Sequence, residues 1–335
     1  MKILKWIGVL IVACVVIIAG GIIYLTSKYP DAGPVPDIKI DATQARLERG
    51  EYLAKHVAVC IDCHSTRDWI YYAGPIVPGS EGQGGEVFNE DLGFPGTIPA
   101  KNITPAAIGN WSDGDVLHAI TAGINKKNQA LFPIMPYPNF AHMTEEDLYS
   151  VIAYIRTLKP VESTVPETSL NFPMNLIVRL IPQKVEIRKT PVDTTNTIEY
   201  GKYLMTVASC SECHTPQDHG KPLPGKTLAG GMEFKLPWGI VRSANITPDA
   251  ETGIGIWTKE QFINKFKTFA GEQARQIPMK PPFNESHFNT IMPWLMYAGM
   301  TERDLGAIYE YLRTVEPVKN KIIKFSSEGV VISAK

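Results

Sequence analysis

The longest apolar run of the chain lies at its N-terminus. Residues 6–25 carry no charge, and Lys2 and Lys5 precede this run. A helix of about twenty residues, rising 1.5 Å per residue, spans roughly the 30 Å of a bilayer core. Basic residues before such a helix favour leaving its N-terminal end in the cytoplasm. We therefore expect residues 1–29 to be an uncleaved signal anchor with one transmembrane helix, after which the chain is exported.

Two other interpretations of this segment stay open. A cleaved signal peptide would end near Ala19-Gly20-Gly21. The stretch Ile11-Val12-Ala13-Cys14 resembles a lipid-attachment motif, although the apolar run continues well beyond Cys14. The length of the run favours the anchor, because it exceeds the apolar region of a usual signal peptide.

After a proline-rich linker, residues 30–42, apolar positions recur at helical spacing. One helix is expected from Thr43 to Val59. Two closing helices are expected after Thr144 and Thr301, whose side chains are good N-caps. The expected fold class is therefore all-α.

The closing helices have matching first turns. Asp147 and Asp304 each follow the cap by three residues, in the position of the acidic partner of a capping box. We expect each closing helix to pack on a helix that contains a Gly-x-Tyr-Leu segment, where Gly50 or Gly201 lets two backbones approach closely.

The second half of the chain repeats the first. The matching pairs include Gly84-Gly85 with Gly230-Gly231, Asn102-Ile103-Thr104-Pro105 with Asn245-Ile246-Thr247-Pro248, and Met135-Pro136-Tyr137 with Met292-Pro293-Trp294. Two copies of one domain explain this order. We expect the copies at residues 43–160 and 193–320, an interdomain linker at 161–192 and a C-terminal tail at 321–335.

The interdomain linker contains an apolar island, residues 170–178. We expect this island to lie across the interface of the two copies. It is too short to span a bilayer, but contact with a membrane is the second interpretation.

Composition narrows the range of partners. The chain has 335 residues, of which 44% are hydrophobic and 20% charged, and its formal net charge is −1. A nearly neutral chain gives no indication of nucleic-acid binding. Of the five cysteines, Cys14 lies in the apolar N-terminus and the other four fall in two short motifs. No thiol remains for a structural disulfide.

The two motifs are Cys60-Ile61-Asp62-Cys63-His64 and Cys210-Ser211-Glu212-Cys213-His214. This pattern is the attachment signature of haem c. Two thiols bond the vinyl groups of one porphyrin, and the adjacent imidazole binds its iron. Zinc knuckles are the alternative, but a zinc site usually joins its Cys pairs across about 15–20 residues. We predict two haem c groups, with thioethers at Cys60, Cys63, Cys210 and Cys213 and iron ligands at His64 and His214.

Haems that carry electrons usually have both axial positions filled, often by His and Met. Met135 and Met292 are the predicted distal ligands, because the proline after each stiffens the loop that would hold the sulfur. Met143 and Met300 repeat equally well and are the alternative. They stand just before a helix N-cap, where an apolar staple is expected.

Other repeated residues have two interpretations each. Trp111 and Trp257 either donate an indole N–H to a haem propionate or simply pack. The Asn-Ile-Thr-Pro segments either lie near the propionates or are plain turns. The histidines outside the motifs have no repeated position and are expected at the surface or in packing, with His142 and His287 the two nearest the methionine loops in sequence: His56, His118, His142, His219 and His287.

The motifs, the Asn-Ile-Thr-Pro segments and the Met-Pro-Tyr and Met-Pro-Trp loops resemble those of class I cytochrome c domains. More narrowly, residues 44–318 resemble the cytochrome c subunits of membrane-bound periplasmic dehydrogenases, of the alcohol and gluconate dehydrogenase type. Those subunits typically carry three haem domains, whereas this chain has two. The resemblance implies tandem haem domains with the thioether and axial residues given above.

The resemblance also implies an electron-transfer protein rather than an enzyme. It would be anchored in the cytoplasmic (inner) membrane with its haem domains on the periplasmic side, since bacteria attach haem c outside that membrane. Expected partners are a periplasmic dehydrogenase subunit, a quinol-linked complex or a terminal oxidase of the respiratory chain. The alternative is a dihaem enzyme, a cytochrome c peroxidase or a thiosulfate dehydrogenase, which needs a displaceable sixth position on one iron.

Overall fold

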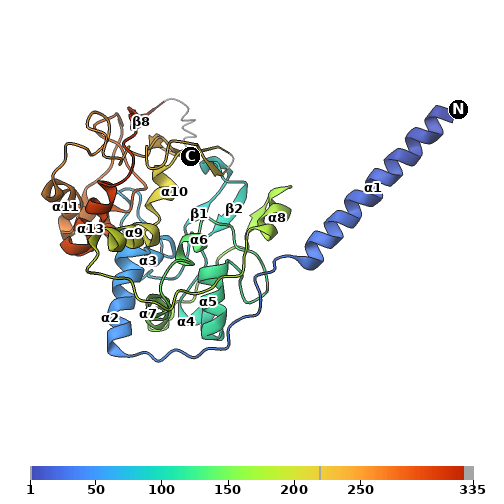
Figure 1. Cartoon of the computed structure of the whole chain (residues 1–335), viewed down its shortest axis with the longest axis horizontal. Helices are drawn as coiled ribbons and strands as arrows, with labels where there is room; N and C mark the ends of the chain where they lie inside the picture. Colours follow the sequence, from blue (N-terminus) through green and yellow to red (C-terminus); the bar gives the residue numbers. More distant parts are fainter. Residues whose placement is uncertain (1, 219, 328–335) are drawn as a thin grey trace.

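The computed structural model describes residues 2–218 and 220–327. Helix α1 (Lys2–Lys28) projects away from the body that contains the rest of these residues (Figure 1). Within the described part of the chain, α1 is the one helix that is long and apolar enough to cross a membrane. The linker after α1 has no regular structure and runs along the first copy, where the Ile40 N–H donates to the Asp113 carboxylate at 2.8 Å.

Helices form the frame of the first copy. They are α2 (Gln44–Tyr52), the π-turn η1 (Leu53–Val57), α3 (Cys60–Cys63), the 3-10 turn η2 (Glu90–Leu92), α4 (Pro105–Ile108), α5 (Asp113–Ala122), α6 (Tyr137–Phe140) and α7 (Glu145–Ile155). The helix predicted from Thr43 is confirmed as α2 and η1, and the Thr43 hydroxyl caps it by accepting from the Arg46 N–H.

The second copy repeats the main helices of the first, without counterparts of η1, η2 and α4 in its described residues. Its elements are α9 (Thr197–Val207), α10 (Cys210–His214), α11 (Lys259–Lys267), the 3-10 turn η4 (Glu272–Gln276), α12 (Trp294–Tyr297) and α13 (Glu302–Leu312). Between the copies lie α8 (Met174–Ile177) and the 3-10 turn η3 (Val178–Leu180).

The predicted packing of each closing helix on its Gly-x-Tyr helix is confirmed. Helix α7 lies against α2, and α13 lies against α9. A Cβ added at Gly50 would collide with the Ser150 carbonyl, and one at Gly201 would collide with the Ala307 carbonyl. The two glycines therefore set the distance between the helices, since any side chain would push the backbones apart.

The expectation of an all-α fold is wrong. The structure is only 40% helical, with 10% strand. Within the described residues, the strands form three small antiparallel sheets, in the orders β1-β2-β3, β4-β5 and β6-β7-β8. Their bounds are β1 (Val87–Phe88), β2 (Gly96–Pro99), β3 (Ser169–Leu170), β4 (Gln217–Asp218), β5 (Lys221–Pro222), β6 (Glu233–Leu236), β7 (Gly239–Arg242) and β8 (Phe325–Ser326).

The strands escaped prediction for a physical reason. They are two to four residues long, too short for an alternating pattern to stand out. Two of the pairings are also non-local: β3, from the linker between the copies, pairs with β2, and β8, from the C-terminal tail, pairs with β7. In each copy the chain after the closing helix thus returns to that copy's own sheet. Residues 328–335 of the predicted tail lie outside the described residues.

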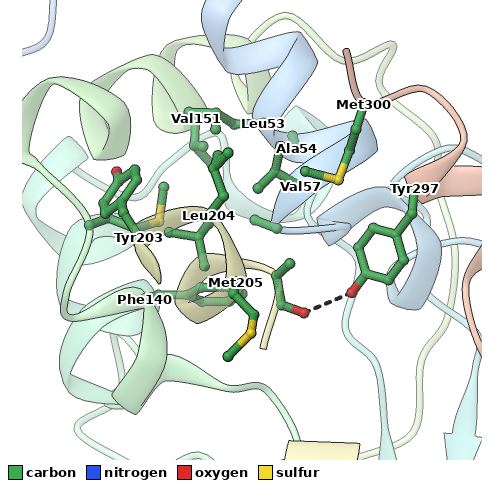
Figure 2. Close-up of a cluster of buried hydrophobic side chains, with 14 of the residues drawn as sticks. Leu53, Ala54, Val57, Phe140, Val151, Tyr203, Leu204, Met205, Tyr297 and Met300 are labelled. Atoms are coloured by element: carbon green, nitrogen blue, oxygen red, sulfur yellow. Dashed lines mark hydrogen bonds between the residues drawn. The ribbon is translucent and has the colours of Figure 1, made fainter. Parts of the chain in front are cut away.

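One apolar cluster joins the two copies (Figure 2). Leu53 and Leu148 of the first copy and Leu204 and Leu305 of the second are fully buried in it. A shared core of this kind removes apolar surface of both copies from water at once, at about 25 cal/mol per Å². The two Cys-x-x-Cys-His motifs are therefore held in a fixed relation to each other.

Candidate haem sites

Each Cys-x-x-Cys-His motif follows a residue in the left-handed backbone region. Val59 (φ 47°) precedes α3, and Ser209 (φ 54°) precedes α10. A β-branched residue rarely adopts such a φ, and strain of this type costs roughly 1–3 kcal/mol. In the first copy the helix before Val59 also widens into the π-turn η1. The same strained position before both motifs indicates that the fold bends the chain there to present the cysteines.

One backbone carbonyl holds the imidazole of each motif. His64 Nδ1 lies 2.6 Å from the Lys101 oxygen, and His214 Nδ1 lies 2.8 Å from the Ala244 oxygen. Because a carbonyl only accepts, each Nδ1 carries the ring proton. The other nitrogen, Nε2, is then unprotonated, which is the state in which imidazole binds a metal.

Burial keeps both rings in this neutral form. It lowers the pKa of His64 and of His214 below the ordinary histidine value, although the hydrogen bond to the carbonyl opposes this effect. An exposed histidine has a pKa of about 6.5, so both rings are neutral near pH 7.

Asn-Ile-Thr-Pro turns fix these two carbonyls. The side-chain oxygens of Asn102 and Asn245 accept from the backbone N–H and the hydroxyl of the threonine two residues on. Their amide groups donate to the carbonyls of Val161 and Val318, beyond the closing helices. The asparagines are thus occupied within the protein, which favours the interpretation as turns. Each turn positions the carbonyl of the residue just before it, Lys101 or Ala244, which accepts the hydrogen bond of the motif histidine.

Two glycines make room for this arrangement. The N–H groups of Gly84 and Gly230 donate to the carbonyls of His64 and His214, each at 2.8 Å. Both glycines have positive φ, 79° and 69°, and a Cβ on either would collide with the backbone at the Asn turn. The sequence revealed the repeat of these glycines but not their role. The carbonyls were missed because a backbone acceptor leaves no signature in residue type.

The methionines separate into two groups. Met135 and Met292 are half-buried at the border of the shared core, which the first cysteine of each motif also borders. Met143 and Met300 are each only 1% exposed and lie inside that core. A sulfur enclosed by packed side chains has no free side for an iron, so this difference favours Met135 and Met292.

Trp111 and Trp257 also lie at the border of the shared core. Among the described residues, neither indole N–H meets a protein acceptor. A partly buried indole usually finds a partner for its N–H, so both remain candidates for a contact with a haem carboxylate.

The donor set fits a haem better than a zinc ion. The described cysteines are all free. Within residues 2–218 and 220–327, no three or more His, Cys, Asp or Glu side chains converge in a way that would hold a metal ion. A zinc knuckle needs four such ligands. The arrangement thus supports two thiols and one imidazole per porphyrin.

The two motifs have different surroundings. Asp62, in the first motif, is 3% exposed and pairs with Arg67 at 2.9 Å. Burial raises the pKa of Asp62, while the Arg67 guanidinium opposes the rise. Glu212, the equivalent residue of the second motif, is exposed and accepts from the Asn139 amide of the first copy at 3.1 Å. A buried ion pair beside one site and a surface carboxylate beside the other make the two electrostatically unequal.

Tyr297 lies in the shared core beside the second motif. Its hydroxyl donates to the carbonyl of Ala208, two residues before Cys210, at 2.7 Å (Figure 2). Burial raises the pKa of Tyr297 well above its ordinary value, and groups of both motifs add to the rise: Cys210, Cys213, Asp62 and Cys63.

The remaining histidines lie where the sequence placed them, except that His219 is outside the described residues. His142 and His287 are exposed, and His118 is buried. His56 is half-buried, and burial lowers its pKa and that of His118.

Comparison with known proteins agrees with this geometry. Residues 198–316 match the family model of cytochrome c. Over these residues the second copy is similar to cytochrome c domains. The fructose dehydrogenase cytochrome subunit of Gluconobacter japonicus is 31% identical over an alignment of 297 positions that covers 85% of this chain and 55% of that protein. The cytochrome c subunit of the quinone alcohol dehydrogenase of Gluconacetobacter polyoxogenes is 28% identical over 83% of this chain and 58% of its own length.

A shorter relative is the dihaem c-type cytochrome of Cereibacter sphaeroides, 30% identical over 56% of this chain and 63% of that protein. The resemblance drawn from the motifs is thereby confirmed. The chain spans little more than half the length of the dehydrogenase cytochrome subunits that it matches.

Proposed function

We propose that the chain is a membrane-anchored dihaem cytochrome c that carries electrons. The two cysteines of each motif would hold one haem c. The matched hydrogen bonds of His64 and His214 to backbone carbonyls carry this proposal, because they leave one unprotonated ring nitrogen per copy for an iron. A copy of the arrangement in each half supports a count of two haems.

Met135 and Met292 are the proposed distal ligands. The bound haem supplies a one-electron couple between ferric and ferrous iron. A thioether is a soft, neutral ligand that favours the ferrous state and raises the reduction potential. Trp111 and Trp257 are proposed to donate their free indole N–H groups to the haem propionates. Two filled axial positions on each iron leave no open place for a substrate, which suits a carrier.

The proposed role is to take electrons from a periplasmic dehydrogenase and pass them to a quinone or an oxidase of the respiratory chain. The names of the relatives support the first half of this role, since they are cytochrome subunits of fructose and alcohol dehydrogenases. Helix α1 would anchor the chain in the cytoplasmic membrane, with both haem domains in the periplasm. An anchored carrier meets membrane-bound partners at a raised effective concentration.

The test starts with the full-length chain, purified from membranes of a host that attaches haem c. The haem content should be two per chain, and added peroxide should not be consumed. Deletion of the gene in the native host should abolish oxygen uptake that is driven by one class of dehydrogenase substrate, such as alcohols or sugars, while uptake driven by NADH is unchanged. Catalytic peroxide consumption, with respiration unaffected on every substrate, would instead support the peroxidase alternative.

A further inference from the structure

An apolar surface lies on the segment between the two copies. Phe172 is 76% exposed, Ile177 is 44% exposed and Leu180 is 46% exposed. We call these three residues the linker patch. A phenyl ring with three quarters of its surface in water forgoes much of the 1.5–3 kcal/mol that burial of such a side chain provides. Large side chains grouped in this way mark a contact with another apolar phase.

The fold fixes the linker patch in place. On its N-terminal side, β3 pairs with β2, and the Asn171 N–H donates to the Pro95 carbonyl at 3.0 Å. Between Ile177 and Leu180, Val178 is buried and holds the segment against the body. The segment is therefore part of the first copy's surface rather than lying across the interface of the two copies, where the sequence suggested it.

The linker patch also lies beside the end of α1. Helices α1 and α8 are in contact, and the Arg179 guanidinium donates to the Tyr29 carbonyl at 2.9 Å. Figure 1 shows α8 as the element of the body next to the inner end of α1. The apolar span ends near Tyr24 and Leu25, so a bilayer that contains α1 has its surface close to this level.

The charges around the linker patch suit a lipid headgroup region. Residues 168–185 contain no acidic residue and two basic ones, Arg179 and Lys184, and Lys28 ends α1. One carboxylate of the first copy, Glu90, accepts from the Asn171 amide beside Phe172. Basic side chains beside exposed phenyl and aliphatic groups are typical of segments that lie in the membrane interface. A docked protein would satisfy the apolar groups as well, but only the bilayer is brought to this place by the chain itself.

We propose that Phe172, Ile177 and Leu180 insert into the periplasmic leaflet of the bilayer that α1 spans. This inference rests on the anchoring role of α1 in the proposed function. It adds a second membrane contact to that of α1. The two contacts meet where Arg179 donates to the Tyr29 carbonyl, although these residues are 150 positions apart in the chain. Two contacts fix the tilt of the haem domains relative to the membrane, whereas one helix and a linker would leave them free to rotate.

Spin labels on the full-length holoprotein in phospholipid nanodiscs test the proposal. The four motif cysteines are consumed by haem, so Cys14→Ser removes the remaining thiol and Phe172→Cys adds the reporter. Ile256→Cys is the matched control, because Ile256 is 74% exposed and comes shortly before α11 in the chain. Helix α11 lies on the side of the body away from α1 (Figure 1). Collision with oxygen, which concentrates in lipid, is compared with collision with a water-soluble nickel chelate. The relaxation of the label under nitrogen is subtracted from that with each reagent. This subtraction removes the constant contribution of the haem irons.

The label at Phe172→Cys should show an oxygen-to-nickel ratio several-fold above that of Ile256→Cys. Equal ratios would overturn the proposal, and so would a label at Phe172→Cys that is shielded from both reagents, because a protein would then cover it. A label on the native Cys14, in the middle of α1, tests the membrane anchor separately from the linker patch. If Cys14 is in lipid and position 172 is not, the linker patch fails and the anchor stands; if Cys14 itself is in water, the anchor fails.

Discussion

The Tyr52 hydroxyl donates a hydrogen bond of 2.5 Å to the carboxylate of Asp304. Tyr52 ends α2 in the first copy, and Asp304 lies in the first turn of α13 in the second. The N–H of Thr301, the N-cap of α13, donates to the same hydroxyl at 3.1 Å. A capping box normally joins these two residues directly. Here a tyrosine of the other copy completes it.

The reverse relationship is also present. The Tyr203 hydroxyl of the second copy donates to Asp147 of the first at 2.5 Å, and the Thr144 N–H donates to that hydroxyl at 3.3 Å. Each copy thus completes the N-terminal cap of the other's closing helix. These two bonds lie at the edge of the shared core and select one relative position of the copies.

Tyr52→Phe should lower the free energy of unfolding by about 1–3 kcal/mol. The ring stays, but a buried carboxylate and a backbone N–H lose their common partner. Denaturant unfolding of the holoprotein at pH 7 measures the change. Tyr149→Phe, a half-buried tyrosine on α7, is the control and should cost less than about 0.5 kcal/mol. Equal losses in the two variants would contradict the role given to the cap.

The cap tyrosines, Tyr52 and Tyr203, and the nearby Tyr200 should make the protein less stable in alkali. Burial, reinforced by the nearby aspartates, raises the pKa of Tyr52 and Tyr203, and burial with the charge of Asp304 raises the pKa of Tyr200 to about 12. The unfolded chain ionises near pH 10 and the folded chain only later. Their contribution is therefore complete below about pH 10 and is lost as pH rises toward the folded pKa values.

Thermal unfolding between pH 8 and pH 12 measures this loss. The midpoint temperature should be constant up to about pH 9.5 and then fall. In that range each such tyrosine lowers the free energy of unfolding by about 1.4 kcal/mol per pH unit. The fall should be shallower in the double variant Tyr52→Phe/Tyr203→Phe. A slope identical to that of the parent would rule out these two groups as its source.

The sequence predicted what depends on residue type and local spacing. The motifs of His64 and His214 and the helix caps follow from residues close together in the chain, and the Gly-x-Tyr packing was predicted because the same segment recurs in both copies. It did not predict what depends on distant backbone: the carbonyls that hold the imidazoles, the tyrosines that complete the caps, and the strands β3 and β8. Those contacts join segments far apart in sequence, so no local pattern records them.

Two neighbouring ion pairs offer a matched comparison. Arg49 makes two hydrogen bonds to Asp147, at 2.7 and 2.9 Å, and Arg46 makes two of the same lengths to Glu146. The Asp147 side chain is 11% exposed, whereas that of Glu146 is 65% exposed. Water screens the second pair and not the first.

Arg49→Lys should therefore cost about 1–3 kcal/mol, because lysine cannot replace the two-point contact with a buried carboxylate. Arg46→Lys should cost less than about 1 kcal/mol. Denaturant unfolding in low and high salt checks both, and salt should reduce only the small effect. A larger loss of stability in Arg46→Lys than in Arg49→Lys would show that the exposure of the carboxylate does not determine the strength of the ion pair.

Gly50→Ala should separate α2 from α7. The added Cβ meets the Ser150 carbonyl, which belongs to the helix backbone and cannot rotate away. The cost should be about 1–3 kcal/mol or more. Gly271→Ala is the control, since its Cβ would meet nothing within 4 Å and its φ is ordinary. Circular dichroism melting compares the two variants; a control that is as unstable as Gly50→Ala would refute the packing argument.

The most direct test of the account is the ferric absorption spectrum of the full-length protein, read at the weak red band that arises from iron–methionine charge transfer. Ligation of both irons by Met135 and Met292 predicts one unit of this band per haem, half of it lost in Met135→Leu and the other half in Met292→Leu, with Met143→Leu and Met300→Leu unchanged. A band that is absent, that corresponds to one haem, or that disappears in the Met143 or Met300 variants would contradict the assignment of His64–Met135 and His214–Met292 as the axial pairs.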